Sequence, residues 1–141
     1  MNIVLDSGAI IAFERGDKAF TAIVQASRRD RVAIAVPSAV LAETWRGAST
    51  HPRSSLLIKS VDDFPSLDFE RARRIGGILA RSETAAVVDG SVVEAALARL
   101  PSMIVTSDPD DIAHLLQSED VAFARFGAAG SKQAQVIIFS I

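Results

Sequence analysis

The sequence contains no cysteine, which excludes disulfide bonds and metal sites built from thiolates. Any metal ion that this chain binds must therefore be held by oxygen or imidazole ligands. Only two histidines are present, and neither His51 nor His114 lies near a nucleophile motif. Isolated histidines of this kind are more often structural or surface residues than general bases, so we assign neither to catalysis. Carboxylates remain as the main candidate ligands.

Long apolar runs and a surplus of positive charge are also missing. No stretch approaches the roughly 18 apolar residues that a membrane-spanning helix needs, and no basic region precedes the first strand pattern. We therefore expect a cytoplasmic protein without membrane association. The formal net charge is −2, although proteins that bind nucleic acid usually carry an excess of Lys and Arg.

Two arginine clusters weaken this objection to nucleic-acid binding. The clusters are Arg28, Arg29 and Arg31, and Arg71, Arg73 and Arg74. Each can produce a local positive field on an acidic protein, and each can equally be an ordinary solvated helix face.

The size and composition indicate a single folded domain. A chain of 141 residues lies near the usual size of one domain, and we assign residues 1–141 to it. Hydrophobic residues make up 49% of the sequence and charged residues 23%, which is too apolar for a disordered chain. No repeat or domain linker interrupts the sequence.

Short apolar runs alternate with helical patterns along the chain. We predict strands at 2–5, 31–36, 64–67, 103–106, 121–126 and 136–141, the last two separated by a turn at 127–130. We predict helices at 8–13, 17–29, 38–47, 53–61, 68–81, 87–100 and 109–118. Continuous apolar strands between helices are typical of a parallel sheet covered on both faces. The predicted fold is therefore α/β, a three-layer α/β/α sandwich with a central parallel sheet.

Two aspartates directly follow predicted strands. Asp6 ends the first strand and Asp108 follows the strand at 103–106. Ligands of open parallel sheets bind outside the carboxyl ends of the strands, so both positions are candidates for a functional site. A structural role is the alternative, because Asp6 can cap a helix and Asp108 before Pro109 is a favourable N-cap.

Two further acids share the apolar side of their predicted helices. Val92 follows Asp89 at i+3, and Val40 precedes Glu43 by three positions. A carboxylate on a core-facing stripe is costly unless it is compensated. Asp89 could be a helix-start aspartate, and Glu43 could form a buried salt bridge with Arg46.

Four carboxylates at one edge of a sheet would repel one another. Either their pKa values rise or a hard cation neutralises them, and oxygen ligands suit Mg²⁺ or Mn²⁺. These ions bridge to substrate phosphates and lower the pKa of a bound water. Hydrolysis of a phosphodiester is a reaction that uses both properties.

Four segments that contain these acids, 3–9, 36–43, 88–89 and 105–111, resemble in content and order the PIN domains, and among them the VapC-like toxins of bacterial toxin–antitoxin pairs. The resemblance covers nearly the whole chain. It implies an α/β/α sandwich and Mg²⁺- or Mn²⁺-dependent cleavage of RNA. It also implies a homodimer and inhibition by a cognate VapB-like antitoxin.

The resemblance also implies roles for individual residues. It places metal binding and catalysis on Asp6, Glu43, Asp89 and Asp108. Asp111 is a further helper, and the Thr106 hydroxyl lies near the site. Because several acids follow one another at 108–111, Asp110 or Asp111 could share the role of Asp108.

Other functions stay open as alternatives. A haloacid-dehalogenase-like phosphatase needs a second aspartate two residues after Asp6, where Gly8 stands. A receiver domain needs a late catalytic lysine, but Lys18, Lys59 and Lys132 do not follow convincing buried strands. A PIN-like domain that binds without catalysis is the remaining alternative.

Overall fold

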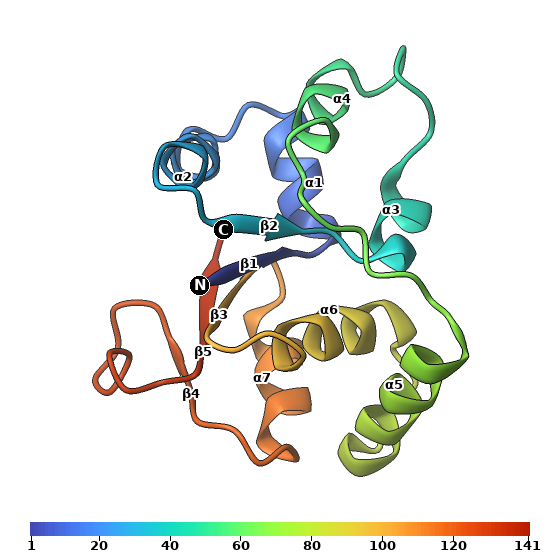
Figure 1. Cartoon of the computed structure of the whole chain (residues 1–141), viewed down its shortest axis with the longest axis vertical. Coiled ribbons are helices and arrows are strands. Elements are labelled where there is room, and N and C mark those ends of the chain that lie inside the picture. Colours follow the sequence, from blue (N-terminus) through green and yellow to red (C-terminus); the bar gives the residue numbers. More distant parts are fainter.

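The computed structural model describes residues 1–141 and is built around one sheet of five strands (Figure 1). The strands are β1 (Asn2–Leu5), β2 (Ala33–Ala35), β3 (Ser102–Thr106), β4 (Phe123–Arg125) and β5 (Val136–Ser140). They lie in the order β2-β1-β3-β5-β4, and every neighbouring pair is parallel. The predicted α/β class and parallel sheet are confirmed.

Seven helices connect and cover the strands. They are α1 (Ser7–Glu14), α2 (Lys18–Arg29), α3 (Ser38–Thr44), α4 (Pro52–Ile58), α5 (Phe69–Ser82), α6 (Val87–Leu97) and α7 (Pro109–Gln117). The chain moves from β1 to β2 through α1 and α2, then crosses back past β1 to reach β3 through α3 to α6. The helices α1 and α2 lie on one face of the sheet, where α3 and α4 pack against α1, and α5, α6 and α7 lie on the other face, which gives the three layers (Figure 1). None of the helices has the length and apolar character needed to cross a membrane.

The neighbouring strands β1 and β3 lie in the middle of the hydrophobic core. All four residues of β1 are buried, as are Ile104, Val105 and Thr106 at the end of β3. Strands buried on both faces show continuous apolar runs instead of alternation, which explains the sequence pattern at 2–5 and 103–106.

The predicted strand at 64–67 is wrong. In this region only an isolated bridge joins Ala35 to Asp63, and the segment continues without regular structure to α5. Pro65 has no backbone N–H to donate to a neighbouring strand. Its carbonyl oxygen accepts a hydrogen bond from the N–H of Ser38 at 2.9 Å. Phe64 packs against the core, whereas Leu67 is exposed, and neither extends the sheet.

The predicted strands near the C-terminus are shorter than expected, and their connection differs from a simple turn. Because β4 and β5 are parallel neighbours, the chain between them must cross back along the whole strand length. Gly127 and Gly130 both have positive φ angles in this connection, at 79° and 82°. The glycine-rich segment is therefore part of a longer loop instead of a hairpin turn.

Three helices end three residues earlier than predicted, and one of them is α4, which ends at Ile58. α3 ends at Thr44, because Trp45 adopts an extended backbone with ψ of 130°. α6 ends at Leu97, three residues before Leu100, whose position ahead of Pro101 disfavours a helical backbone.

A buried glutamate joins α5 to α6. Glu94 is 3% exposed and accepts one bond from Arg71 Nη1 at 2.9 Å and another from Arg74 Nε at 3.0 Å. A buried carboxylate is costly without such partners, so the two arginines stabilise the packing of these helices.

We expect Arg71→Ala to reduce the free energy of unfolding more than Arg74→Ala. The Arg71 side chain is 25% exposed and that of Arg74 is 53% exposed, so water replaces the Arg74 interaction more readily. The expected losses are about 2 kcal/mol and about 1 kcal/mol, respectively. Urea denaturation of the two variants measures the difference, and equal losses would contradict this ranking.

Candidate active site

The carboxyl ends of β1 and β3 bring two of the predicted acids to one edge of the sheet. The strands are direct neighbours, with Leu5 opposite Val105, and the N–H of Asp6 donates to the Val105 carbonyl at 3.2 Å. Asp108 follows β3, and its N–H donates to Thr106 Oγ1 at 2.9 Å. The backbone of both strand ends is thereby fixed.

Asp6 caps the first helix. Its Oδ1 accepts the N–H of Ala9 at 2.9 Å, and the residue is only 4% exposed. Ser7 is the first residue of α1, and its side chain takes no part in the cap. The Ser7 hydroxyl instead donates to Glu43 Oε2 at 2.9 Å and so connects α1 with α3.

All four predicted acids line one cleft of about 300 Å³. The cleft is lined by Asp6, Ser7, Gly8, Glu43, Ala86, Val87, Val88, Asp89 and Asp108. These residues come from the ends of β1 and β3, from α1 and α3, and from the start of α6. No lysine or arginine lies among the lining residues, so the carboxylates have no cationic partner there.

Glu43 differs from its predicted environment. It is exposed at the rim of the cleft instead of buried on an apolar face, because α3 is short and ends one residue later at Thr44. The alternative salt bridge with Arg46 is absent, since Arg46 Nη1 donates to the carbonyls of Ala42 and Trp45.

The crowded acids change one another's protonation. Burial, and after it the negative charges of Asp111, Asp6, Asp108 and Glu43 in that order of effect, together raise the pKa of Asp89 to about 6. Burial also raises the pKa of Asp6, against the opposing effect of hydrogen bonds from the Thr106 side chain and the Ala9 N–H. The cleft is therefore a region of uncompensated negative charge.

The structure separates the two acids that follow Asp108. Asp110 is 90% exposed and forms an ion pair with Arg125 at the end of β4. Asp111, in contrast, exerts the strongest charge effect on Asp89. Of the two, Asp111 is the one that belongs to the electrostatic environment of the cleft.

The donor atoms of the cleft fit a hard cation in kind. They are carboxylate and hydroxyl oxygens, the ligands that Mg²⁺ and Mn²⁺ prefer, and no lysine or arginine lies among the lining residues. As they stand, no three Asp, Glu or His side chains are arranged so that they could hold one ion together. The carboxylates must therefore turn toward one another to bind a cation.

Gly8 is a site residue that the sequence did not indicate as such. A Cβ atom built on Gly8 would lie 2.1 Å from Ser107 Oγ and 2.6 Å from Ser107 Cβ. The absence of a side chain at Gly8 allows the start of α1 to approach the loop after β3, and so allows Asp6 and Asp108 to share one cleft. A glycine in a strand-to-helix connection is too common a signal to reveal this contact.

We expect Gly8→Ala to destabilise the fold by about 1–3 kcal/mol, because the added methyl group overpacks the contact with Ser107. The double variant Gly8→Ala/Ser107→Gly removes the clashing side-chain atoms and should recover most of this loss. Thermal denaturation of both variants provides the measurement. A double variant as unstable as Gly8→Ala would show that the Ser107 side chain is not the cause.

We also expect the metal-free protein to lose stability as the pH rises from 5 to 7.5. Folding raises the pKa of Asp89 to about 6, so the folded protein keeps this proton to a higher pH than the unfolded chain does. The bound proton therefore stabilises the folded state at low pH, and this contribution disappears as the pH rises through the pKa of about 6. After allowance for solvent screening, the loss is about 1 kcal/mol. Glu14, Asp30 and Asp68 have lowered pKa values, so their titration is complete below this range.

Urea denaturation at the two pH values, with a chelator present, measures this loss. Asp89→Asn is the matched variant, because it keeps the size of the side chain and removes the titrating charge. Its stability should depend less on pH than that of the unchanged protein, and identical pH dependence in both would exclude Asp89 as the source.

Comparison with known proteins identifies a similar fold. No family model matches the sequence, and no curated protein is significantly similar to it. Among solved structures, the chain resembles one in the crystal structure of VapBC2 from Rickettsia felis bound to a DNA fragment from their promoter. The TM-score is 0.63 at 14% sequence identity, over 81% of this chain and 95% of the matched chain. The protein therefore has the fold of that chain, as the resemblance to PIN domains predicted.

Proposed function

We propose that this chain is a Mg²⁺- or Mn²⁺-dependent endoribonuclease of the VapC type. The observation that carries the proposal is that four acidic residues from separate segments line one cleft. No lysine or arginine side chain lines this cleft to neutralise their negative charge. Two of these acids follow neighbouring parallel strands, at the edge where open α/β sheets bind their ligands. The shared fold with a chain of a VapBC2 complex supports the same assignment.

In this proposal Asp6, Glu43, Asp89 and Asp108 hold the cation. When bound, the ion supplies an activated water and neutralises charge on the phosphodiester that is cleaved. The chain itself orients the ligands through hydrogen bonds. The Ser7 hydroxyl restrains Glu43, and the Ala9 N–H restrains Asp6.

The raised pKa of Asp89 is what we expect of a carboxylate that binds a positively charged ligand. Near pH 6 the metal-free protein binds a proton at this group about half of the time, and that proton compensates part of the crowded charge. A divalent cation in the cleft would favour the ionised form. Protons and cations should therefore compete for Asp89.

We further propose RNA as the substrate, a homodimer as the assembly, and a VapB-like antitoxin as the inhibitor, all in the cytoplasm. The similar solved structure is itself a VapBC2 complex. A negative cleft is also a suitable site for an arginine of a partner protein, because a guanidinium can pair with two carboxylates at once.

Incubation of the purified protein with a mixed RNA pool tests the nuclease activity. We expect cleavage with Mn²⁺ and none with a chelator. Asp89→Asn should slow cleavage by at least on the order of 100-fold, because it removes a metal ligand. Asp110→Asn is the matched control and should retain activity, since the Asp110 side chain is exposed and directed to Arg125.

Other outcomes favour the alternatives. Cleavage that is independent of metal and unchanged in Asp89→Asn would contradict the proposal. Binding of Mn²⁺ and RNA without cleavage would indicate a catalytically silent PIN-like binding module. Hydrolysis of phosphomonoesters with intact RNA would indicate another Asp-dependent phosphoryl hydrolase.

A further inference from the structure

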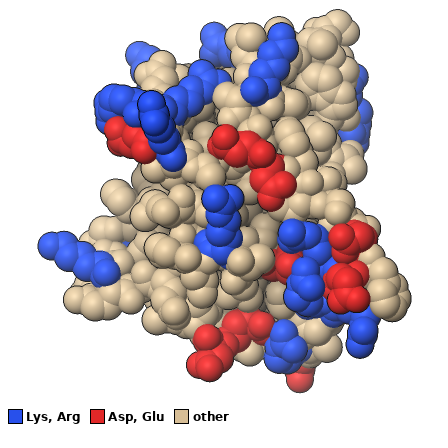
Figure 2. Space-filling view, in the orientation of Figure 1, with Lys and Arg blue, Asp and Glu red and all other residues tan.

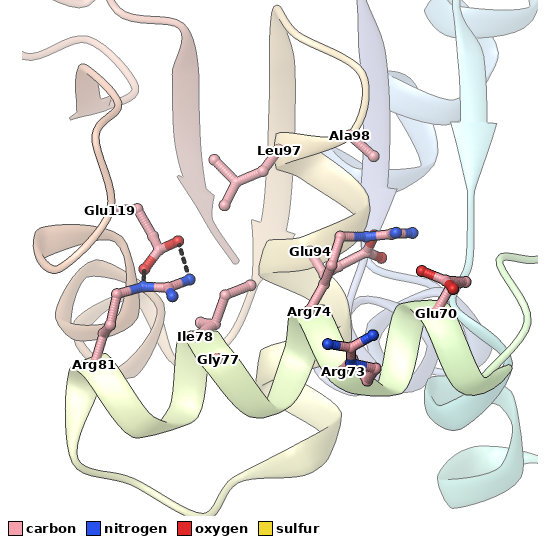
Figure 3. A pocket seen from close by; sticks show the side chains of 10 residues that line it. All are labelled: Glu70, Arg73, Arg74, Gly77, Ile78, Arg81, Glu94, Leu97, Ala98 and Glu119. Carbon is pink, nitrogen blue, oxygen red and sulfur yellow. Dashed lines mark hydrogen bonds and ion pairs between the residues drawn. The ribbon is translucent and has the colours of Figure 1, made fainter.

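A second hollow, larger than the acid cleft, lies between α5, the end of α6 and the residues after α7 (Figure 3). Its volume is about 540 Å³, which is the size of a typical small-molecule site. It is lined by Glu70, Arg73, Arg74, Gly77, Ile78, Arg81, Glu94, Leu97, Ala98 and Glu119, and we call it the arginine pocket. None of these residues has a part in the acid cleft.

Salt bridges fix two of the arginines in this pocket. Arg81 forms two parallel bonds with Glu119, from Nε at 2.8 Å and from Nη2 at 2.9 Å, and Figure 3 shows this pair at one end of the pocket. Arg74 is held by the buried Glu94, which also binds Arg71. Glu94 thus has two cationic partners, although the three arginines and three glutamates that line the pocket balance in formal charge.

Hydrogen-bond donors of two adjacent arginines stay free. Arg74 uses only Nε for Glu94, so its two terminal nitrogens have no partner within the chain. Arg73 forms no hydrogen bond or ion pair, and its guanidinium lies over the Phe69 ring at 5.7 Å from the ring centre. Stacking of this kind restrains a guanidinium without using its N–H groups.

The other arginine cluster of the sequence provides a contrast. Lys and Arg side chains gather over α2 as well as over α5 in the space-filling view (Figure 2). On α2, however, Arg29 pairs with the adjacent Asp30, Arg28 donates to Ser60, and neither lines the apolar hollow beside this helix. Those residues match the expectation of a solvated helix face, whereas the arginines of α5 surround a pocket.

We infer that the arginine pocket binds the phosphate group of a small organic molecule of nucleotide size. Guanidinium groups offer paired donors that match the oxygens of a phosphate. The side chains of the half-buried Leu97 and the exposed Ala98 provide an apolar surface for the rest of the ligand. A long polyanion fits less well, because Glu70, Glu94 and Glu119 also line the pocket and would repel additional phosphates.

The site is separate from the acid cleft. Asp89 lies in the first turn of α6, whereas Leu97 ends the same helix, eight residues and about 12 Å further along its axis. The bound molecule would therefore be an additional ligand of the protein, and its binding needs neither a metal ion nor the four clustered acids.

Calorimetric titration of adenosine monophosphate into Asp6→Asn protein, with a chelator present, tests this inference. The Asp6→Asn change and the chelator prevent a metal ion in the acid cleft from binding the phosphate, so the result does not depend on the proposed nuclease. We expect binding that Arg73→Gln weakens by about tenfold. Arg29→Gln removes the same charge from α2 and should leave the affinity unchanged.

Two further ligands separate the contribution of the phosphate group from that of the rest of the nucleotide. Adenosine, which has no phosphate, should not bind, and inorganic phosphate should bind more weakly than the nucleotide. The inference is overturned if neither phosphate compound binds, if adenosine binds as well as the nucleotide, or if Arg29→Gln is as harmful as Arg73→Gln. Because Arg73 is exposed and unpaired, its replacement should not disturb folding, and circular dichroism verifies this.

Discussion

The parallel pairing of β1 with β3 is the constraint on which the candidate site depends. The two strands occupy the centre of the sheet, where burial on both faces leaves no freedom to shift their register. Each strand ends in an acid-bearing loop, so a register chosen by hydrophobic packing also determines the distance between Asp6 and Asp108. Stability of the core and geometry of the cleft thus have the same origin.

The acids in the cleft oppose folding, and other parts of the structure compensate for them. Asp6 recovers part of the cost of burial through its bond with the Ala9 N–H at the positive end of α1. Asp89 has no such hydrogen bond, and burial together with the neighbouring acids raises its pKa to about 6. Glu94 shows the contrasting solution for a buried carboxylate, since two arginines neutralise it. The same chain therefore contains one compensated acid that joins helices and several uncompensated acids that surround a cleft.

Much of this arrangement follows from the sequence, because burial on both faces produces continuous apolar strands and the strand ends are visible as aspartates. The positions of Asp6 and Asp108 in one cleft could be anticipated from these strand ends. That of Asp89 could be anticipated from its place on the apolar side of its helix. The exposure of Glu43 could not, because it depends on where α3 ends, and helix ends respond to tertiary contacts. The parallel pairing of β4 with β5 and the approach of Gly8 to Ser107 were equally inaccessible, since both arise from contacts between segments. The arginines of α5 were visible as a cluster, but only the packing of α6 against them reveals a pocket.

The double role of Asp6 has a consequence for the tolerance of this position to change. One of its carboxylate oxygens is committed to the start of α1, while the charge of the group faces the cleft that Asp6 lines. A glutamate would carry the same charge, yet its longer side chain could not reproduce the short bridge to Ala9 while remaining in the same place. An asparagine would keep the bridge and lose the charge. Aspartate is the one residue that meets both demands, so selection for a stable helix and selection for a negative cleft act on this position together.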